Sequence, residues 1–92
     1  MFDTETYKKH LQNGAEILYL CTENDENGNP RRGYFHTKTG TFYDEGYAGH
    51  HAVPENLRKA AYFAEFDHRI DLSVEEYEST LNAIQIADLL FN

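Results

Sequence analysis

The sequence predicts an α+β fold, in which a small three-stranded antiparallel sheet packs with two or three helices in the order α-β-β-β-α-α. Three observations predict it: helix-start signals near both ends of the chain, an apolar segment followed by two short strand-like segments, and turn-forming residues between these segments. The 92 residues fall in the range of one domain, 1–92. A chain of this length builds one modest core.

The first predicted element is a helix over residues 4–13. Asp3 is a good N-cap, and Gly14 can end the last turn. Phe2 and Tyr7 stand at the two positions of a hydrophobic staple, which fixes how the chain enters a helix. Local signals at both ends therefore favour a helix here.

The first predicted strand covers residues 15–23. Both alternating sets of side chains in this segment are apolar, which is typical of a central strand covered on both faces. The turn-forming cluster 24–30, which contains Asn27-Gly28, ends the strand.

Two further strands are predicted over residues 31–37 and 41–44. A three-residue loop, 38–40, joins them, and Gly40 can take the left-handed conformation that such a loop needs. Because both connections are short, the three strands are expected to form an antiparallel meander.

This meander is expected to carry a row of aromatic side chains on one face. Pairing across the three-residue loop puts Phe35 opposite Tyr43 and His36 opposite Phe42. The first hairpin would bring Tyr19 alongside Phe35.

The segment between the sheet and the last helix is ambiguous. Residues 45–53 contain two glycines and no clear period, so an irregular loop is expected. Pro54 can open a helix with Leu57, Ala61 and Ala64 on one side. The aromatic residues at 62, 63 and 66 allow a strand instead, so the sequence does not decide between helix and strand for residues 55–66.

The last helix is predicted to run from Ser73 to near Leu90. Ser73 and Glu76 form a capping box, in which each residue satisfies a backbone N–H group of the other. Leu72 and Tyr77 stand at the positions of a hydrophobic staple.

Charge and cysteine content narrow the classes of function. Sixteen acidic residues oppose eight basic ones, for a formal net charge of -8 and a pI near 4.9. Direct nucleic-acid binding is therefore disfavoured, whereas a basic protein surface would be attracted. The single cysteine and the lack of an apolar leader favour the cytoplasm, and no apolar run is long enough for a membrane span.

Metal binding, cofactor binding and catalysis have weak support. His36, His50 and His51 are the obvious metal ligands, but adjacent histidines project in different directions and lack a spaced partner pair, so no metal site is predicted. Cys21 lies inside an apolar strand, where cysteine usually behaves as a small hydrophobe. No cofactor fingerprint is present, which favours a protein that is not an enzyme.

The leading hypothesis is a non-enzymatic acidic interaction protein, of the kind that regulates or inhibits a larger protein by docking on its basic, nucleic-acid-binding surface. In its sharpest form, acidic side chains mimic the phosphates of a nucleic acid. The tyrosines would serve as contact residues. The alternative explanation of the negative charge is that it only keeps the protein soluble, as a solvated acidic face. The predicted acidic patch consists of Glu65, Asp67, Asp71, Glu75 and Glu78.

A second surface is predicted at the C-terminal end, where apolar residues exceed the single stripe of a one-sided helix. Either the rest of the domain covers them, or the helix binds a partner or forms a homodimer. The residues expected to self-associate are Ile86, Leu89, Leu90 and Phe91.

The alternative function is a small-molecule-binding module or small enzyme. Its pocket would lie between the sheet and the glycine-containing loop, because aromatic walls with a few polar groups suit such a site. The candidate lining residues are Tyr34, His36, Tyr47, His50 and His51.

Overall fold

The computed structural model describes residues 4–24, 27–46 and 48–91, with the side chains of residues 4, 24 and 83–91 outside the description. The fold is α+β, with the order α-β-β-β-α-β-α. Its elements are α1 (Thr4–Gln12), β1 (Ile17–Asn24), β2 (Pro30–His36), β3 (Phe42–Asp44), the 3-10 helices η1 (Gly49–Ala52) and η2 (Glu55–Leu57), α2 (Arg58–Asp67), β4 (Arg69–Leu72) and α3 (Val74–Phe91).

The sheet has four strands, in the order β3-β2-β1-β4, instead of the three that were predicted. Strand β1 pairs antiparallel with β2 and parallel with β4, so the sheet is mixed. The prediction missed β4 because its signal is only four residues long, with Ile70 and Leu72 alternating with two charged residues. Pairing with β1, which is distant in the sequence, makes this segment a strand.

The predicted register of the second hairpin is wrong by one residue. Phe35 pairs with Phe42 and Tyr34 pairs with Tyr43, because the connecting loop has four residues, 37–40, and not three. A shift of one residue moves a side chain to the other face of a sheet. The aromatic row therefore exists with other members, since Tyr19, Tyr34 and Tyr43 lie side by side across β1, β2 and β3.

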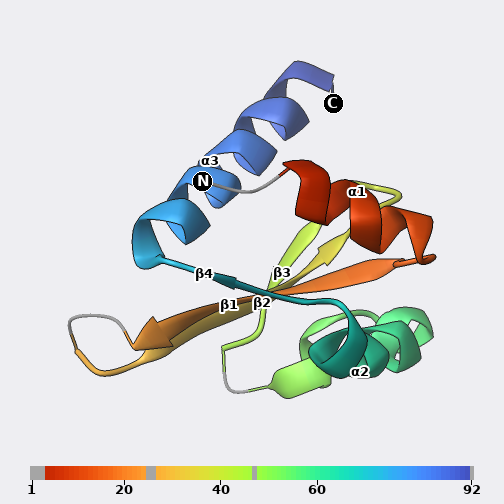
Figure 1. Ribbon diagram of the computed structural model, residues 1–92, viewed down its shortest axis with the longest axis horizontal. Coiled ribbons are helices and arrows are strands. Elements are labelled where there is room, and N and C mark those ends of the chain that lie inside the picture. The colour runs from red at the N-terminus through yellow and green to blue at the C-terminus, as the bar shows by residue number, and fades with distance from the viewer. Residues whose placement is uncertain (1–3, 25–26, 47, 92) are drawn as a thin grey trace.

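Helices cover both faces of the sheet, and each face has its own buried cluster (Figure 1). Helix α2 lies against one face, where the cluster comprises Ile17, Tyr19, Cys21, Tyr34, Val53, Leu57, Ala61 and Ala64. Helices α1 and α3 lie on the other face, where the cluster comprises Ala15, Leu18, Leu20, Ile70, Leu72 and Tyr77.

The ambiguous segment before the last strand is helical. Ala61 and Ala64 are buried on one side of α2, and Leu57 is buried at the end of η2 just before it, as the helical alternative predicted. The loop before it contains the 3-10 helix η1, so it is less irregular than expected. Among the described residues, no helix is long and apolar enough to cross a membrane.

The start of α3 confirms the predicted cap. The backbone N–H of Glu76 donates to the Ser73 hydroxyl at 3.1 Å. Leu72 and Tyr77 belong to the same buried cluster, as expected of a hydrophobic staple.

Candidate functional site

The outer side of α2 exposes three aromatic rings. Tyr62, Phe63 and Phe66 are 50%, 51% and 71% exposed, because they lie on the helix side opposite the buried Ala61 and Ala64. The Tyr62 ring meets the Phe66 ring edge-on, with centroids 5.4 Å apart. We call these three residues the aromatic surface.

Two histidines extend this surface towards η1. The His50 ring lies edge-on to Tyr62, with centroids 5.7 Å apart, and the His51 ring lies 4.4 Å from His50. Histidine and aromatic rings are therefore contiguous from η1 to the last turn of α2.

Beneath α2, two tyrosines of the sheet donate hydrogen bonds to carboxylates. The Tyr19 hydroxyl donates to Glu45 at 2.8 Å, and the Tyr34 hydroxyl donates to Glu65. The two rings lie with centroids 4.9 Å apart. Burial raises the pKa of both hydroxyls well above the usual range, and the hydrogen bonds to the two carboxylates raise it further. These hydroxyls stay protonated and bind the sheet to α2 and to the loop after β3.

An open depression of about 660 Å³ lies beside this network, at the start of β2 and the loop after β3. Its lining residues include Arg32, Glu45 and His50. Within the described residues, the Arg32 guanidinium has no ion-pair partner. The depression therefore combines one cation, one carboxylate and one imidazole.

Of the predicted ligand-pocket residues that the structure describes, only His50 and His51 lie together, with ring centroids 4.4 Å apart. Tyr34 is fully buried under α2, His36 lies at the far end of β2, and His51 is exposed. Of the described members of the predicted set, only His50 lines the depression. Tyr47 lies outside the described residues.

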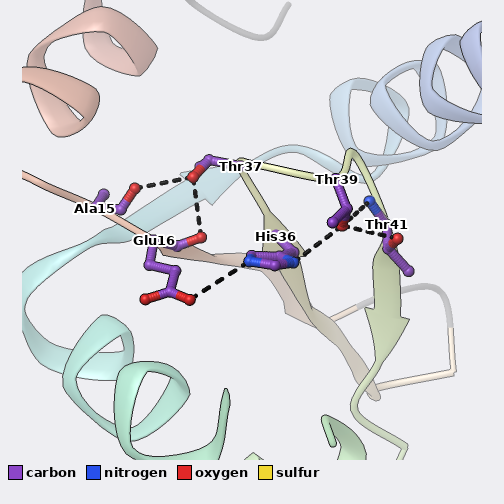
Figure 2. A network of polar contacts seen from close by, with 6 residues as sticks. All are labelled: Ala15, Glu16, His36, Thr37, Thr39 and Thr41. Carbon is purple, nitrogen blue, oxygen red and sulfur yellow. Dashed lines mark hydrogen bonds and ion pairs between the residues drawn. The ribbon is translucent and has the colours of Figure 1, made fainter. Parts of the chain in front are cut away.

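His36 has a structural environment at the hairpin end, which Figure 2 shows in close view. Its Nδ1 lies 2.9 Å from the Thr39 hydroxyl, and its Nε2 lies 3.6 Å from a Glu16 carboxylate oxygen. The Thr37 hydroxyl donates to the carbonyls of Ala15 and Glu16 at 2.9 and 3.0 Å. The network fastens the β2–β3 loop to the start of β1.

The predicted acidic residues are spread over α2, β4 and α3. Glu65 is half-buried against Tyr34, and Asp67 is exposed at the end of α2. The other three follow one another along edge strand β4 and the start of α3. We call this group the acidic edge; it consists of Asp71, Glu75 and Glu78.

Two members of the acidic edge have cationic neighbours. The Arg69 side chain contacts Asp71 at 3.0 Å, and Arg31 contacts Glu78 at 3.0 Å. Both carboxylates remain open to water, at 72% and 60% side-chain exposure. Glu75 is exposed and has no ion-pair or hydrogen-bond partner among the described residues. Exposed pairs of this kind leave much of the negative potential in place.

Three of the tyrosines expected as contact residues lie in the core. Tyr19, Tyr34 and Tyr77 are buried, and of the described tyrosines only Tyr62 is exposed. Their partly polar rings fill the small core, so they are unavailable as contact residues.

The predicted self-association residues lie on the second half of α3. The structure confirms the helix there, but the side chains of Ile86, Leu89, Leu90 and Phe91 lie outside the description. Their role stays a prediction.

Cys21 is buried at the centre of the sheet, and burial raises the pKa of its thiol to about 11. The thiol is therefore protonated at neutral pH, which does not suit a nucleophile. Within the described part of the chain, no three His, Cys, Asp or Glu side chains are placed to hold a metal ion.

Sequence reasoning missed the aromatic surface. The signal was present, because Lys59, Tyr62, Phe63 and Phe66 repeat at helical spacing on the side opposite the small buried residues. This spacing defines one surface only if residues 58–67 are helical, because in a strand Tyr62 and Phe63 would point to opposite faces.

No protein-family model matches the chain, and neither a curated protein nor a solved structure is significantly similar to it. Function therefore has to be inferred from the chain's own side chains.

Proposed function

We propose that this protein is a non-enzymatic interaction module that docks its acidic edge on a basic surface of a larger protein. The observation that carries the proposal is Glu75, an exposed carboxylate without a partner in the described structure, with the exposed Glu78 about one turn further along α3. Carboxylates that are only partly compensated attract cationic side chains.

The surrounding charge favours the same class of partner. The net charge of -8 gives a long-range field that steers a basic surface towards the protein and repels free nucleic acid. A nucleic-acid-binding groove on a regulated protein is a basic surface of this kind. Inhibition would follow from occupying that groove.

The backbone of the acidic edge suits docking by side chains. Strand β4 has only four residues and carries Arg69 and Asp71, and short, charged edge strands resist pairing with a further strand. A partner is therefore expected to contact the carboxylates of the edge and not to extend the sheet.

The test compares two matched substitutions, Glu75→Lys and Glu55→Lys. Both residues are exposed near the start of a helical element, and both reversals change the net charge equally. Only Glu75 belongs to the acidic edge. The probe is a labelled arginine-rich peptide, and the readouts are its affinity, the salt dependence of that affinity and the melting temperature.

We expect Glu75→Lys to weaken binding by about tenfold and flatten its salt dependence, since local attraction becomes repulsion. Glu55→Lys should have a smaller effect. The free energy of unfolding of each variant should stay within about 0.5 kcal/mol of that of the original protein, as for ordinary surface substitutions, so the melting temperature should change little. Equal effects of the two reversals would show that binding responds only to net charge and would contradict the proposal.

A second candidate function is favoured by the depression beside the Tyr19–Glu45 hydrogen bond. The Arg32 guanidinium, which has no ion-pair partner among the described residues, lines it together with Glu45 and His50, and this set suits a small ligand carrying a negative group. Equal behaviour of the two reversals would make this candidate the better one.

A further inference from the structure

The aromatic surface on α2 is large for a chain of this size. An aromatic side chain covers about 150–250 Å², so three rings at half exposure or more leave roughly 300 Å² of apolar area open. Patches of this size on small proteins are often functional.

The charges on α2 are arranged in an unusual way. Its first turn contains no acidic residue and its last turn contains no basic residue. Instead, Lys59 is exposed near the start and Asp67 is exposed at the end. A helix macrodipole favours the opposite order, so neither charge is placed to stabilise its own helix.

The same order is self-complementary. Lys59 and Asp67 are eight residues apart, or about 12 Å along the helix, with Phe63 midway between them. Two copies of α2 packed antiparallel around Phe63 would place each Lys59 beside the Asp67 of the other copy. A two-fold axis produces both contacts at once.

We propose that the aromatic surface is the contact between two copies of this chain, packed as an antiparallel pair of α2 helices. Tyr62, Phe63 and Phe66 form the apolar centre of the contact, and two Lys59–Asp67 ion pairs close its ends. Each cation then lies near the negative end of the partner's helix, which the macrodipole favours. This inference concerns α2 and does not depend on what binds the acidic edge.

The size of the contact predicts a weak dimer. The two aromatic surfaces together contribute roughly 600 Å², and stable interfaces bury about 1,200 Å² or more in total. His50, His51 and the ion pairs add area at the rim. A dissociation constant in the micromolar range or above is expected, so the dimer should respond to single substitutions.

The test uses three charge variants and sedimentation velocity over a range of concentrations. Lys59→Asp places two acidic residues together at each end of the contact, and Asp67→Lys places two basic residues there. Each of these two variants alone should raise the dissociation constant of the dimer by about tenfold or more. An equimolar mixture should form heterodimers, because every end then joins opposite charges. The control, Lys38→Asp, changes an exposed lysine of the β2–β3 loop and should leave the dimer intact.

Both α2 variants also provide a check on folding. Each substitution places its new charge where the macrodipole favours it, so the monomer should be at least as stable as the original protein. Phe66→Ser tests the apolar centre and should also abolish the dimer.

Three results would overturn the inference: a protein that is monomeric at all concentrations, a dimer that survives both Lys59→Asp and Phe66→Ser, or single variants that fail to associate when mixed. A dimer that persists in these variants but is lost in Ile86→Ser would place the contact on α3 instead.

Discussion

The two faces of the sheet are packed in different ways. On the face covered by α1 and α3, buried aliphatic residues and the Phe42 and Tyr77 rings, which meet edge-on with centroids 5.9 Å apart, make an apolar cluster. On the face covered by α2, Tyr19 and Tyr34 extend through the cluster and donate to carboxylates at its rim.

The two faces therefore contribute differently to the fold: one mainly stabilises it, and the other also favours one particular strand register. Burial of apolar area stabilises the first face without requiring particular partners. The second face adds directed hydrogen bonds, which are formed only if Tyr19 and Tyr34 point towards α2. A shift of one residue in the register would turn these hydroxyls to the other face, so the network favours the observed pairing.

The packing of the face covered by α1 and α3 requires that residue 33 has no side chain. A substitution at Gly33 is therefore expected to have the largest effect on stability. A Cβ atom there would lie 2.1 Å from Cζ of Phe42, far inside contact distance. Gly33→Ala must therefore displace the ring and disturb its contact with Tyr77. We expect a loss of about 1–3 kcal/mol in the free energy of unfolding, measured by chemical denaturation.

The control for Gly33→Ala is the double variant with Phe42→Ala. Because alanine suits a strand better than glycine, the substitution should cost little once the ring is gone. Strong coupling in this double-mutant cycle is expected. Additive effects of the two substitutions would show that the ring is not the obstacle.

The polar face is tested by removing one hydroxyl group, which is expected to have an intermediate effect. Tyr34→Phe keeps the ring and deletes the donor to Glu65. A hydrogen bond to a charged group contributes about 1.5–3 kcal/mol; water can partly solvate the half-buried Glu65, so we expect a loss of about 1–2 kcal/mol.

Tyr77→Phe is the matched control on the apolar face. Among the described residues, the Tyr77 hydroxyl has no hydrogen-bond partner, although its ring is equally buried. Its deletion should therefore change the free energy of unfolding by less than about 0.5 kcal/mol. Equal losses in the two variants would remove the distinction between the faces.

The sequence predicted the elements that have local signals. Ser73 and Glu76 identify the start of α3, and the alternating apolar residues of β1 identify a central strand, because capping and burial are recorded in a few neighbouring residues. The pattern of β1 also indicates a further strand. In a three-stranded meander the first strand lies at an edge, whereas side chains that are apolar on both faces are typical of a central strand, so β1 needs the second neighbour that β4 provides.

Other features depend on contacts that a single pattern does not record. The register of Phe35 and Phe42 follows from one extra loop residue, and the strand at Ile70 follows from pairing with β1. Most of the predicted acidic residues are exposed, but Glu65 is half-buried and accepts a hydrogen bond from Tyr34. The aromatic surface required the helix α2 to be known first.

The smallest expected effect concerns the junction between the two faces. His10 of α1 and His68, which follows α2, have their Nδ1 atoms 3.0 Å apart. One neutral ring donates and the other accepts, so protonation of the accepting nitrogen breaks this hydrogen bond. Burial lowers the pKa of His10, and the neighbouring His68 and Lys9 lower it further.

The direction of the pH effect follows from this lowered pKa. Folding favours neutral His10, so its contribution to stability is present above the unfolded pKa of about 6.5 and is lost as the pH falls through the lower folded value. We expect the free energy of unfolding to fall in mildly acidic solution by less than the roughly 1 kcal/mol of one hydrogen bond. His10→Gln should remove this part of the pH dependence, whereas His51→Gln, which changes an exposed histidine of η1, should preserve it. If both variants keep the acidic decline, carboxylates and not the His10–His68 contact cause it, and α1 is joined to the α2 side of the sheet by packing alone.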